Sequence, residues 1–235
     1  MNVLIVLAHP ERGSFNGAMT DVACATLRTA GHVVELSDLY RMRFNPVHDR
    51  HNFATVADAA YFKPQVEEQY ASAHDGFAAD LRAEQDKLLA ADLLIFQFPL
   101  WWFGMPAILK GWVDRVLAMG RLYGGGRWYD RGVLAGKRAL CALTTGGPPT
   151  MFAPDGLAGD LAMLLYPIHH GTFYFTGCTP LQPFVVYGPT RMDDAQRAAE
   201  LERWRQALLT LDERPAIEYP KLAEYDEVLR LKRRR

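Results

Sequence analysis

An aromatic loop at residues 98–106 interrupts the middle of the chain, with the sequence Phe-Pro-Leu-Trp-Trp-Phe-Gly-Met-Pro. An ordinary turn does not need so many large rings. Adjoining flat side chains can bind a planar ligand by stacking, whereas the alternative is a hydrophobic plug beneath a sheet edge. The adjacent pair Trp101 and Trp102 favours the first interpretation, so we expect a binding platform here.

A second loop, residues 9–16, offers chemistry of a different kind. It leads into a helix whose free amides and positive dipole end can hold phosphate. Ser14 and Asn16 add side-chain donors, although both could simply cap the helix while His9 packs locally. The loop has neither the glycine spacing of a dinucleotide fingerprint nor the lysine of a P-loop.

A third loop follows residue 143 with the sequence Thr144-Thr145-Gly146-Gly147. Glycine has no side chain, so backbone amides in this turn can approach a planar ligand closely. A run of this kind is an ordinary turn when it stands alone. Its interest lies in its position beside the other two loops.

The elements that must position these loops alternate along the chain. Short apolar runs predict strands, and amphipathic or well-capped segments predict helices. The expected strands are residues 3–8, 33–37, 92–98, 138–144 and 184–187. The expected helices lie within residues 18–30, 78–90, 106–117, 155–165 and 193–211, the first with Ser14 as N-cap and Gly31 just past its end. Five strands separated by helices predict a doubly wound parallel sheet, in which all three loops lie at the carboxyl edge where ligands bind.

The length of 235 residues and the 49% hydrophobic content suit one substantial core. We expect a single domain over residues 1–211, with a long excursion at about residues 38–77. The remainder, residues 212–235, contains two prolines and predicts an extended arm with a short helical end.

The formal net charge of −1 excludes the broad basic surface that nucleic-acid binding requires. We interpret the terminal run Lys-Arg-Arg-Arg as a frayed end. Cys24, Cys141 and Cys178 are widely separated and odd in number, which favours buried free thiols in a reducing cytoplasm. No cationic leader and no run of membrane-spanning length is seen, so we expect a protein that is neither exported nor membrane-spanning.

Long stretches of the chain resemble the NAD(P)H:quinone oxidoreductases of the DT-diaphorase type. The similar stretches are LIVLAHPERGSFNGAM, SDLYRMRFNPV, AEQDKLLAADLLIFQFPLWWFGMPAILKGWVDRV, ALTTGGPPTMF and GDLAMLLYPIHHGTFYFTG. The resemblance implies a flavodoxin-like α/β fold with a five-stranded sheet of order 2-1-3-4-5 and helices on both faces. It also implies bound FAD, with FMN as an alternative, NAD(P)H as co-substrate, and a homodimer whose active sites lie at the subunit interface.

The resemblance also assigns residues to the site. Those implied to hold the cofactor are His9, Ser14, Phe15, Asn16, Pro99, Leu100, Trp101, Trp102, Phe103, Thr144, Thr145, Gly146, Gly147 and Arg197. Those implied to form the nicotinamide and quinone pocket are Tyr123, Met151 and Phe175, with Trp128 as a neighbour. For Arg197, a surface charge on the last helix is an equal alternative.

The chain departs from the family at two positions that supply a tyrosine and a histidine for charge stabilisation and proton donation. The matching residues are Phe152 and Ala158, neither of which can donate a proton. His169 and His170 could take over proton delivery, but adjacent histidines point in different directions, which favours one packed and one exposed. No third ligand accompanies them, so we expect no metal site.

The implied reaction is two-electron reduction of a quinone or similar acceptor by NAD(P)H through the flavin, in two half-reactions. Nitro- or azo-compound reduction is chemically continuous with it. Because of Phe152 and Ala158, a flavin-binding regulatory protein with weak or no activity is the main alternative. A flavodoxin-type electron carrier fits poorly, since such carriers are shorter and strongly acidic.

Overall fold

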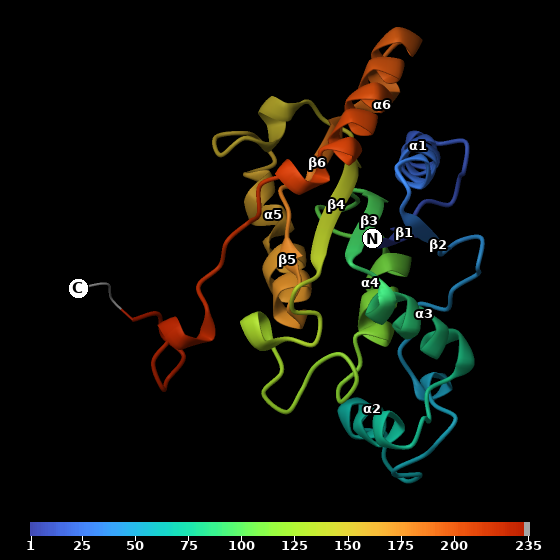
Figure 1. Ribbon diagram of the computed structural model, residues 1–235, viewed down its shortest axis with the longest axis vertical. Helices are drawn as coiled ribbons and strands as arrows, with labels where there is room; N and C mark the ends of the chain where they lie inside the picture. The colour runs from blue at the N-terminus through green and yellow to red at the C-terminus, as the bar shows by residue number, and fades with distance from the viewer. Residues whose placement is uncertain (233–235) are drawn as a thin grey trace.

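A computed structural model of the chain describes residues 1–232 (Figure 1). The predicted frayed tail falls mainly on residues 233–235, which lie outside the described part. The sheet contains β1 (Asn2–Leu7), β2 (Val33–Asp38), β3 (Leu93–Pro99), β4 (Arg138–Thr145), β5 (Thr179–Pro180) and β6 (Phe184–Tyr187). All pairings are parallel, and the order is β2-β1-β3-β4, with β5 and β6 both pairing with β4.

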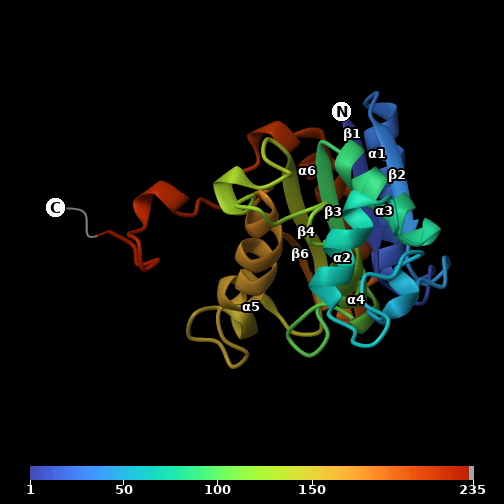
Figure 2. The same cartoon turned by 90° about the horizontal axis from the view of Figure 1, so that it is seen from below.

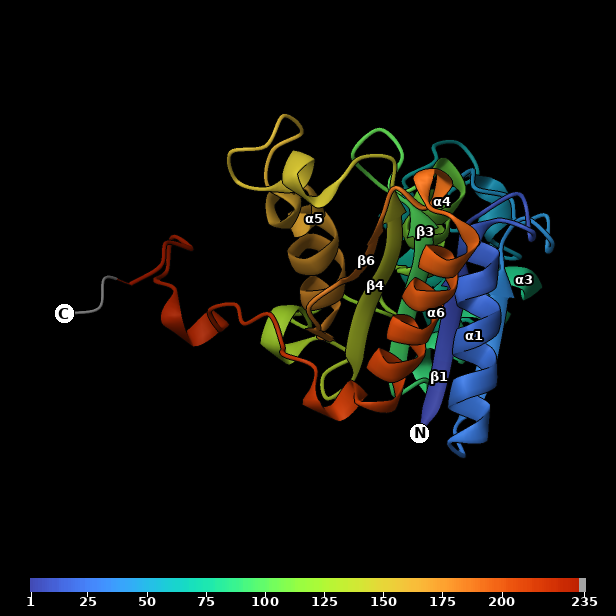
Figure 3. The ribbon, with the colours of Figure 1, turned by 90° about the horizontal axis from the view of Figure 1, so that it is seen from above.

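The helices cover both faces of this sheet. They are α1 (Phe15–Thr29), α2 (Pro64–Ala73), α3 (Ala79–Ala90), α4 (Ala107–Val116), α5 (Leu161–Ile168) and α6 (Asp194–Leu209). Figure 3 shows α1 and α6 in front of the sheet and α3 and α4 behind it. A π-helix, His169–Tyr174, continues α5 directly. The predicted doubly wound fold with helices on both faces is confirmed.

Alternation along the strands builds two cores, because successive side chains of a strand point to opposite faces. Val3 and Ile5 of β1 belong to a cluster with Trp204 of α6, whereas Leu4 and Val6 belong to the larger cluster behind the sheet. Strand β3 is buried along its whole length, as a central parallel strand requires.

Local signals in the sequence set the start and the end of α1. The Ser14 side chain accepts a hydrogen bond from the amide of Gly17 at 3.2 Å, as an N-cap does. Gly31 follows the helix with a φ of 82°, a left-handed conformation that glycine adopts without steric cost. Both expectations for this helix are confirmed.

Four expectations need correction. The edge of the sheet has an additional short strand, β5. The excursion contains the helix α2, which the sequence pattern missed because two of its three buried positions are carboxylates, Glu67 and Glu68. The helix expected within residues 155–165 begins only at Leu161. The C-terminal arm has single 3₁₀ turns at Leu211–Glu213 and Leu222–Glu224 and, as far as residue 232, no terminal α-helix.

The arm runs outward from the body in every view (Figure 2). Its first residues pair with the sheet edge, since Gln182 donates to the Pro215 carbonyl at 2.9 Å and Ile217 donates to the Pro180 carbonyl at 2.7 Å. Over residues 1–232, no helix combines the length and the apolar character needed to cross a membrane.

Candidate functional site

The three loops singled out in the sequence meet at the carboxyl edge of β1, β3 and β4. The rings of His9 and Trp101 lie 6.0 Å apart between centroids. The Leu100 amide donates to the Thr144 carbonyl at 2.8 Å, which joins the second loop to the third. Asn16 Nδ2 donates to Thr144 Oγ1 at 2.9 Å, which joins the first loop to the third. The fold therefore assembles one site from three separate segments.

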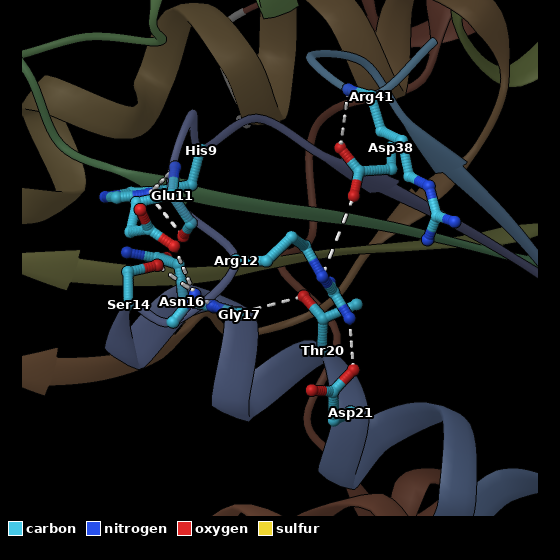
Figure 4. Close-up of polar contacts among 11 residues, drawn as sticks. His9, Glu11, Arg12, Ser14, Asn16, Gly17, Thr20, Asp21, Asp38 and Arg41 are labelled. Carbon is cyan, nitrogen blue, oxygen red and sulfur yellow. Dashed lines mark hydrogen bonds and ion pairs between the residues drawn. The ribbon is translucent and has the colours of Figure 1, made fainter.

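The first loop is a compact turn held by its own polar groups (Figure 4). The Glu11 amide donates to His9 Nδ1 at 3.1 Å, and the Glu11 carboxylate accepts from the Gly13 amide at 2.8 Å. At the start of α1, the amide of Gly17 is taken by the Ser14 side chain. First-turn amides have no partner within a helix, so those of Phe15 and Asn16 are left to bind an anion.

The aromatic loop combines exposure with backbone strain. Trp102 is 97% exposed, Phe103 is 50% exposed and Trp101 is 42% exposed. Trp102 and Phe103 have φ angles of 50° and 59°, in the left-handed region that bulky residues rarely adopt. Such strain costs on the order of 1–3 kcal/mol per residue and concentrates at ligand sites. Exposed apolar rings held at this cost indicate a surface that a ligand covers.

The third loop presents its backbone and buries its hydroxyls. Thr144 and Thr145 are 6% and 4% exposed, and Thr145 Oγ1 donates to the Gly147 carbonyl at 3.0 Å. Gly146 is exposed, and an added Cβ there would meet no atom within 4 Å. The space beside Gly146 is therefore open to a ligand that approaches the main chain.

Two predicted contact residues, Asn16 and Thr144, have their side chains committed to each other. Gln97 of β3 extends the connection, since its Nε2 donates to Asn16 Oδ1 at 2.9 Å. All three side chains are buried. They hold the loops in register, and the neighbouring backbone remains available for a ligand. Sequence reasoning missed Gln97, although a single polar residue within an apolar central strand is a usable signal.

Arg197 lies in α6 at half-buried depth, with its guanidinium bound locally. It donates to the carbonyls of Pro189 and Met192 and to Asp194, the last at 2.6 Å. The Phe152 ring is buried, lies 6.1 Å from the ring of Tyr187, and is adjacent to the half-buried Met151. Ala158 is half-buried in the same segment.

The remaining pocket residues lie elsewhere on the chain. The rings of Tyr123 and Phe175 are 5.6 Å apart, and both line a cavity of about 620 Å³ between α2, α4 and the π-helix. Its α4 residues, Val113 and Asp114, come from the end of that helix remote from the aromatic loop. Trp128, 37% exposed, follows Tyr123 along the chain without lining the cavity. One chain thus holds the aromatic loop and this cavity as separate surfaces.

The cavity also contains polar residues that sequence reasoning missed: His48, Gln65 and Glu68. Gln65 Nε2 donates to the Tyr123 hydroxyl at 3.2 Å. Burial raises the pKa of Glu68 to about 7 and lowers the pKa of His48. Consecutive carboxylates in a segment without apolar period were the available signal.

The adjacent histidines differ in burial, although neither of them is exposed. His169 is buried and its burial lowers its pKa to about 4, whereas His170 is half-buried and stacks on Tyr166 with ring centroids 4.8 Å apart. In the described part of the chain, no group of three or more potential ligands could hold a metal ion.

A doubly wound parallel sheet with a phosphate-type helix start, an exposed aromatic loop and an open glycine turn at one edge defines a flavodoxin-like protein. Comparison with known proteins agrees, because the sequence profile of the flavodoxin-like fold matches residues 1–208. NAD(P)H dehydrogenase [quinone] 1 of Rattus norvegicus is 42% identical over 224 residues, covering 95% of this chain and 82% of the relative. Ribosyldihydronicotinamide dehydrogenase [quinone] of Homo sapiens is 41% identical over 210 residues, covering 89% and 91%.

Solved structures agree with these relatives. A protein from Klebsiella pneumoniae, named as a candidate quinone reductase, superposes with a TM-score of 0.95 at 38% identity and covers 99% of this chain and 94% of its own. The NAD(P)H:quinone oxidoreductase of Methanothermobacter marburgensis gives a TM-score of 0.71 at 27% identity, with 90% and 97% covered. The chain belongs to the flavodoxin-like family, within the group of the NAD(P)H:quinone oxidoreductases.

Proposed function

We propose that this protein is a flavin-dependent NAD(P)H:quinone oxidoreductase that binds FAD. The observation that carries the proposal is the aromatic loop, where Trp102 and Phe103 keep exposed rings on a strained backbone beside an open glycine turn. The free first-turn amides of α1 fit the phosphates of such a cofactor. The names of the relatives and the solved structures support the same activity.

The chain's own residues would divide the work as follows. The first-turn amides of α1 hold the phosphates, and the loop from Pro99 to Phe103 lies against the flavin ring. The amides of Gly146 and Gly147 are the donors we assign to the ring edge where negative charge accumulates. A bound flavin supplies the hydride chemistry, and the protein supplies orientation and electrostatics. Arg197 is already bound locally, so we assign it to holding the loop before α6 beside the cofactor.

We further propose a cytoplasmic homodimer with its active sites at the interface. The separation of the aromatic loop from the cavity of Tyr123 and Phe175 supports this arrangement, because a second copy could bring the two surfaces together. In this arrangement Met151 and Trp128 would complete the pocket wall. The domain proposal is unchanged, with residues 1–211 binding the flavin and residues 212–235 forming an arm.

The experiment begins with purification and chemical identification of any released flavin, which distinguishes FAD from FMN. Anaerobic addition of NADH or NADPH should then bleach the flavin absorbance, and a benzoquinone should restore it. Bound flavin that stays oxidised with both nucleotides would overturn the enzyme and favour a flavin-binding regulator, the candidate that Phe152 and Ala158 support. Replacing the benzoquinone with a nitroaromatic compound or an azo dye tests the alternative acceptors.

A further inference from the structure

The 620 Å³ cavity that holds Tyr123 and Phe175 also holds a buried acid. Glu68 projects from α2 into it with a side chain only 6% exposed. One wall is the π-helix, which contributes Gly171 and Thr172. Single-turn π-helices in proteins occur frequently at functional sites. The proposed substrate pocket therefore contains an ionisable group for which the binding of a flat aromatic molecule gives no reason.

Contacts with the backbone and with His48 position the Glu68 side chain, and they allow its carboxyl to exchange a proton. Its Oε2 accepts from the Met119 amide at 2.6 Å, and its Oε1 lies 3.4 Å from His48 Nε2. That His48 nitrogen is buried and has no hydrogen-bond partner among residues 1–232. Burial is the main cause of both pKa shifts, raising that of Glu68 to about 7 and lowering that of His48. Near neutral pH the pair is thus poised between a protonated and an ionised carboxyl.

Other charged groups around the cavity do not neutralise Glu68. Asp114 of α4 is half exposed and pairs with Lys110 at 2.5 Å; it also acts on His48, where its charge opposes the lowering of the pKa by burial. Arg115 of α4 turns away and donates to Asn52 at 2.7 Å. The neighbouring Glu67 is bound to the backbone amides of residues 57 and 58 and to Arg50.

The groups that face the cavity from the other elements carry no charge at neutral pH. The loop after α4 presents the Tyr123 hydroxyl, whose pKa burial raises, and the helical wall presents Thr172 and Thr176. Within residues 1–232, His48 is therefore the basic side chain that lies at ion-pair distance from the Glu68 carboxylate.

Quinone reduction needs a proton donor that the expected positions lack. A quinone that accepts a hydride becomes a hydroquinone monoanion, and it needs one further proton to become the neutral product. The family resemblance implies that this proton comes from the positions that Phe152 and Ala158 occupy here, and neither residue can supply it. A carboxyl with a pKa near the working pH is well suited to the task.

We propose that Glu68 is the proton donor to the reduced acceptor in this cavity, and that His48 is a positioning residue through which the carboxyl regains its proton from water. The proposal rests on the proposed function. The O–H bond of the Glu68 carboxyl breaks, an O–H bond forms on the hydroquinone anion, and the carboxylate left behind is reprotonated by way of the imidazole. Two electrons and one proton arrive as hydride from NAD(P)H, so the second proton completes the balance.

The test uses the flavin-loaded protein and three variants: Glu68→Gln, Glu68→Asp, and Glu202→Gln as a control carboxyl on the exposed face of α6, paired with Arg205 and away from the cavity. Stopped-flow absorbance follows flavin reduction by NAD(P)H and, separately, reoxidation by a benzoquinone across neutral pH. Wild-type reoxidation should slow as pH rises through about 7, the pKa of the donor. Glu68→Gln should lower its rate on the order of 10²-fold and remove the pH dependence. Glu68→Asp should retain a titration, and Glu202→Gln should match wild type.

A second readout does not need activity or the cofactor. Infrared difference spectra of flavin-free protein, recorded as pH is raised, should show loss of a protonated-carboxyl band near pH 7 in wild type and Glu202→Gln but not in Glu68→Gln. Normal flavin reduction with an unchanged reoxidation profile in Glu68→Gln overturns this proposal alone. A carboxyl already ionised at pH 5 also overturns it alone. Failure of NAD(P)H to reduce the flavin overturns both proposals.

Discussion

Individual residues at this site carry costs that the fold alone does not require. Trp102 has a φ of 50° and is 97% exposed, so its side chain contributes little to the folded chain without a ligand. A left-handed conformation costs a residue other than glycine about 1–2 kcal/mol. The backbone strain at Trp102 is therefore explained only by a ligand that covers its ring.

Replacing Trp102 with glycine separates these two effects. Trp102→Gly should leave the flavin-free protein as stable as wild type or up to about 1 kcal/mol more stable, because relief of strain offsets the entropy of glycine. The flavin Kd should rise about tenfold from the loss of a stacked ring. Denaturant unfolding and flavin titration measure the two quantities. Tyr61→Gly is the control, since Tyr61 is 64% exposed, has no positive φ and belongs to neither proposed site, and it should leave the flavin Kd unchanged. A large loss of stability in Trp102→Gly would contradict the strain argument.

Glu68 gives a second prediction at this scale, for stability against pH. Its folded pKa of about 7 lies above its ordinary value of 4.5, so between these values the folded state binds more protons than the unfolded state. Stability therefore falls as pH rises through this window, by at most about 3 kcal/mol from this group. Glu68→Gln should remove that slope and be more stable than wild type at pH 8 but not at pH 5. Urea unfolding at the two pH values checks this, and parallel curves for both proteins would contradict it.

At the scale of elements, the excursion between β2 and α3 is fixed by contacts with α4. Arg115 is 2% exposed and donates to the Asn45 carbonyl and to Asn52, both at 2.7 Å. Gly111 lies against the excursion so closely that an added Cβ would be 2.3 Å from the Pro46 carbonyl oxygen. The cavity wall built by α2 therefore depends on this close approach.

Gly111→Ala tests the approach. Alanine is favoured over glycine in a helix interior by about 1 kcal/mol, but the clash is with backbone that cannot move cheaply. We expect net destabilisation of about 1–3 kcal/mol, seen as a lower midpoint in thermal or denaturant unfolding. Gly104→Ala is the control, because an added Cβ there meets nothing within 4 Å. If Gly111→Ala were as stable as wild type, the backbone around Pro46 would have to shift without cost to accept the added Cβ.

Elements with apolar periods or clear caps could be predicted from the sequence, and those held by polar groups could not. The helix expected within residues 106–117 is α4, which buries Leu109, Trp112 and Val116. Helix α2 was missed because Glu67 and Glu68 fill two of its three buried positions, and a hydrophobic pattern cannot show a carboxylate that accepts backbone amides. For the same reason, the hydrophobic pattern did not reveal Glu68, the acid of the cavity. The three loops were identified because they follow buried strands, whereas the Asn16–Thr144 hydrogen bond spans 128 residues and has no local signal.

At the scale of the whole molecule, the aromatic loop and the cavity lie on separate parts of one chain. If two copies complete each active site, mixing two damaged proteins should restore function. One variant carries Trp101→Ala and Trp102→Ala, and the other carries Tyr123→Ala. After unfolding and refolding together, half of the dimers are mixed and each has one intact site, so about a quarter of wild-type activity should return. Each variant refolded alone is the control, and no gain on mixing would place the whole site within one chain.

The burial of the three cysteines affects how the protein tolerates quinones. Cys24, Cys141 and Cys178 are all buried, and burial raises the pKa of each thiol, that of Cys178 to about 12. The thiolate is the reactive form of cysteine, and quinones are electrophiles that alkylate it. A protein built in this way keeps every sulfhydryl out of reach of its own substrate. Turnover of arylating compounds should therefore leave its thiol count intact.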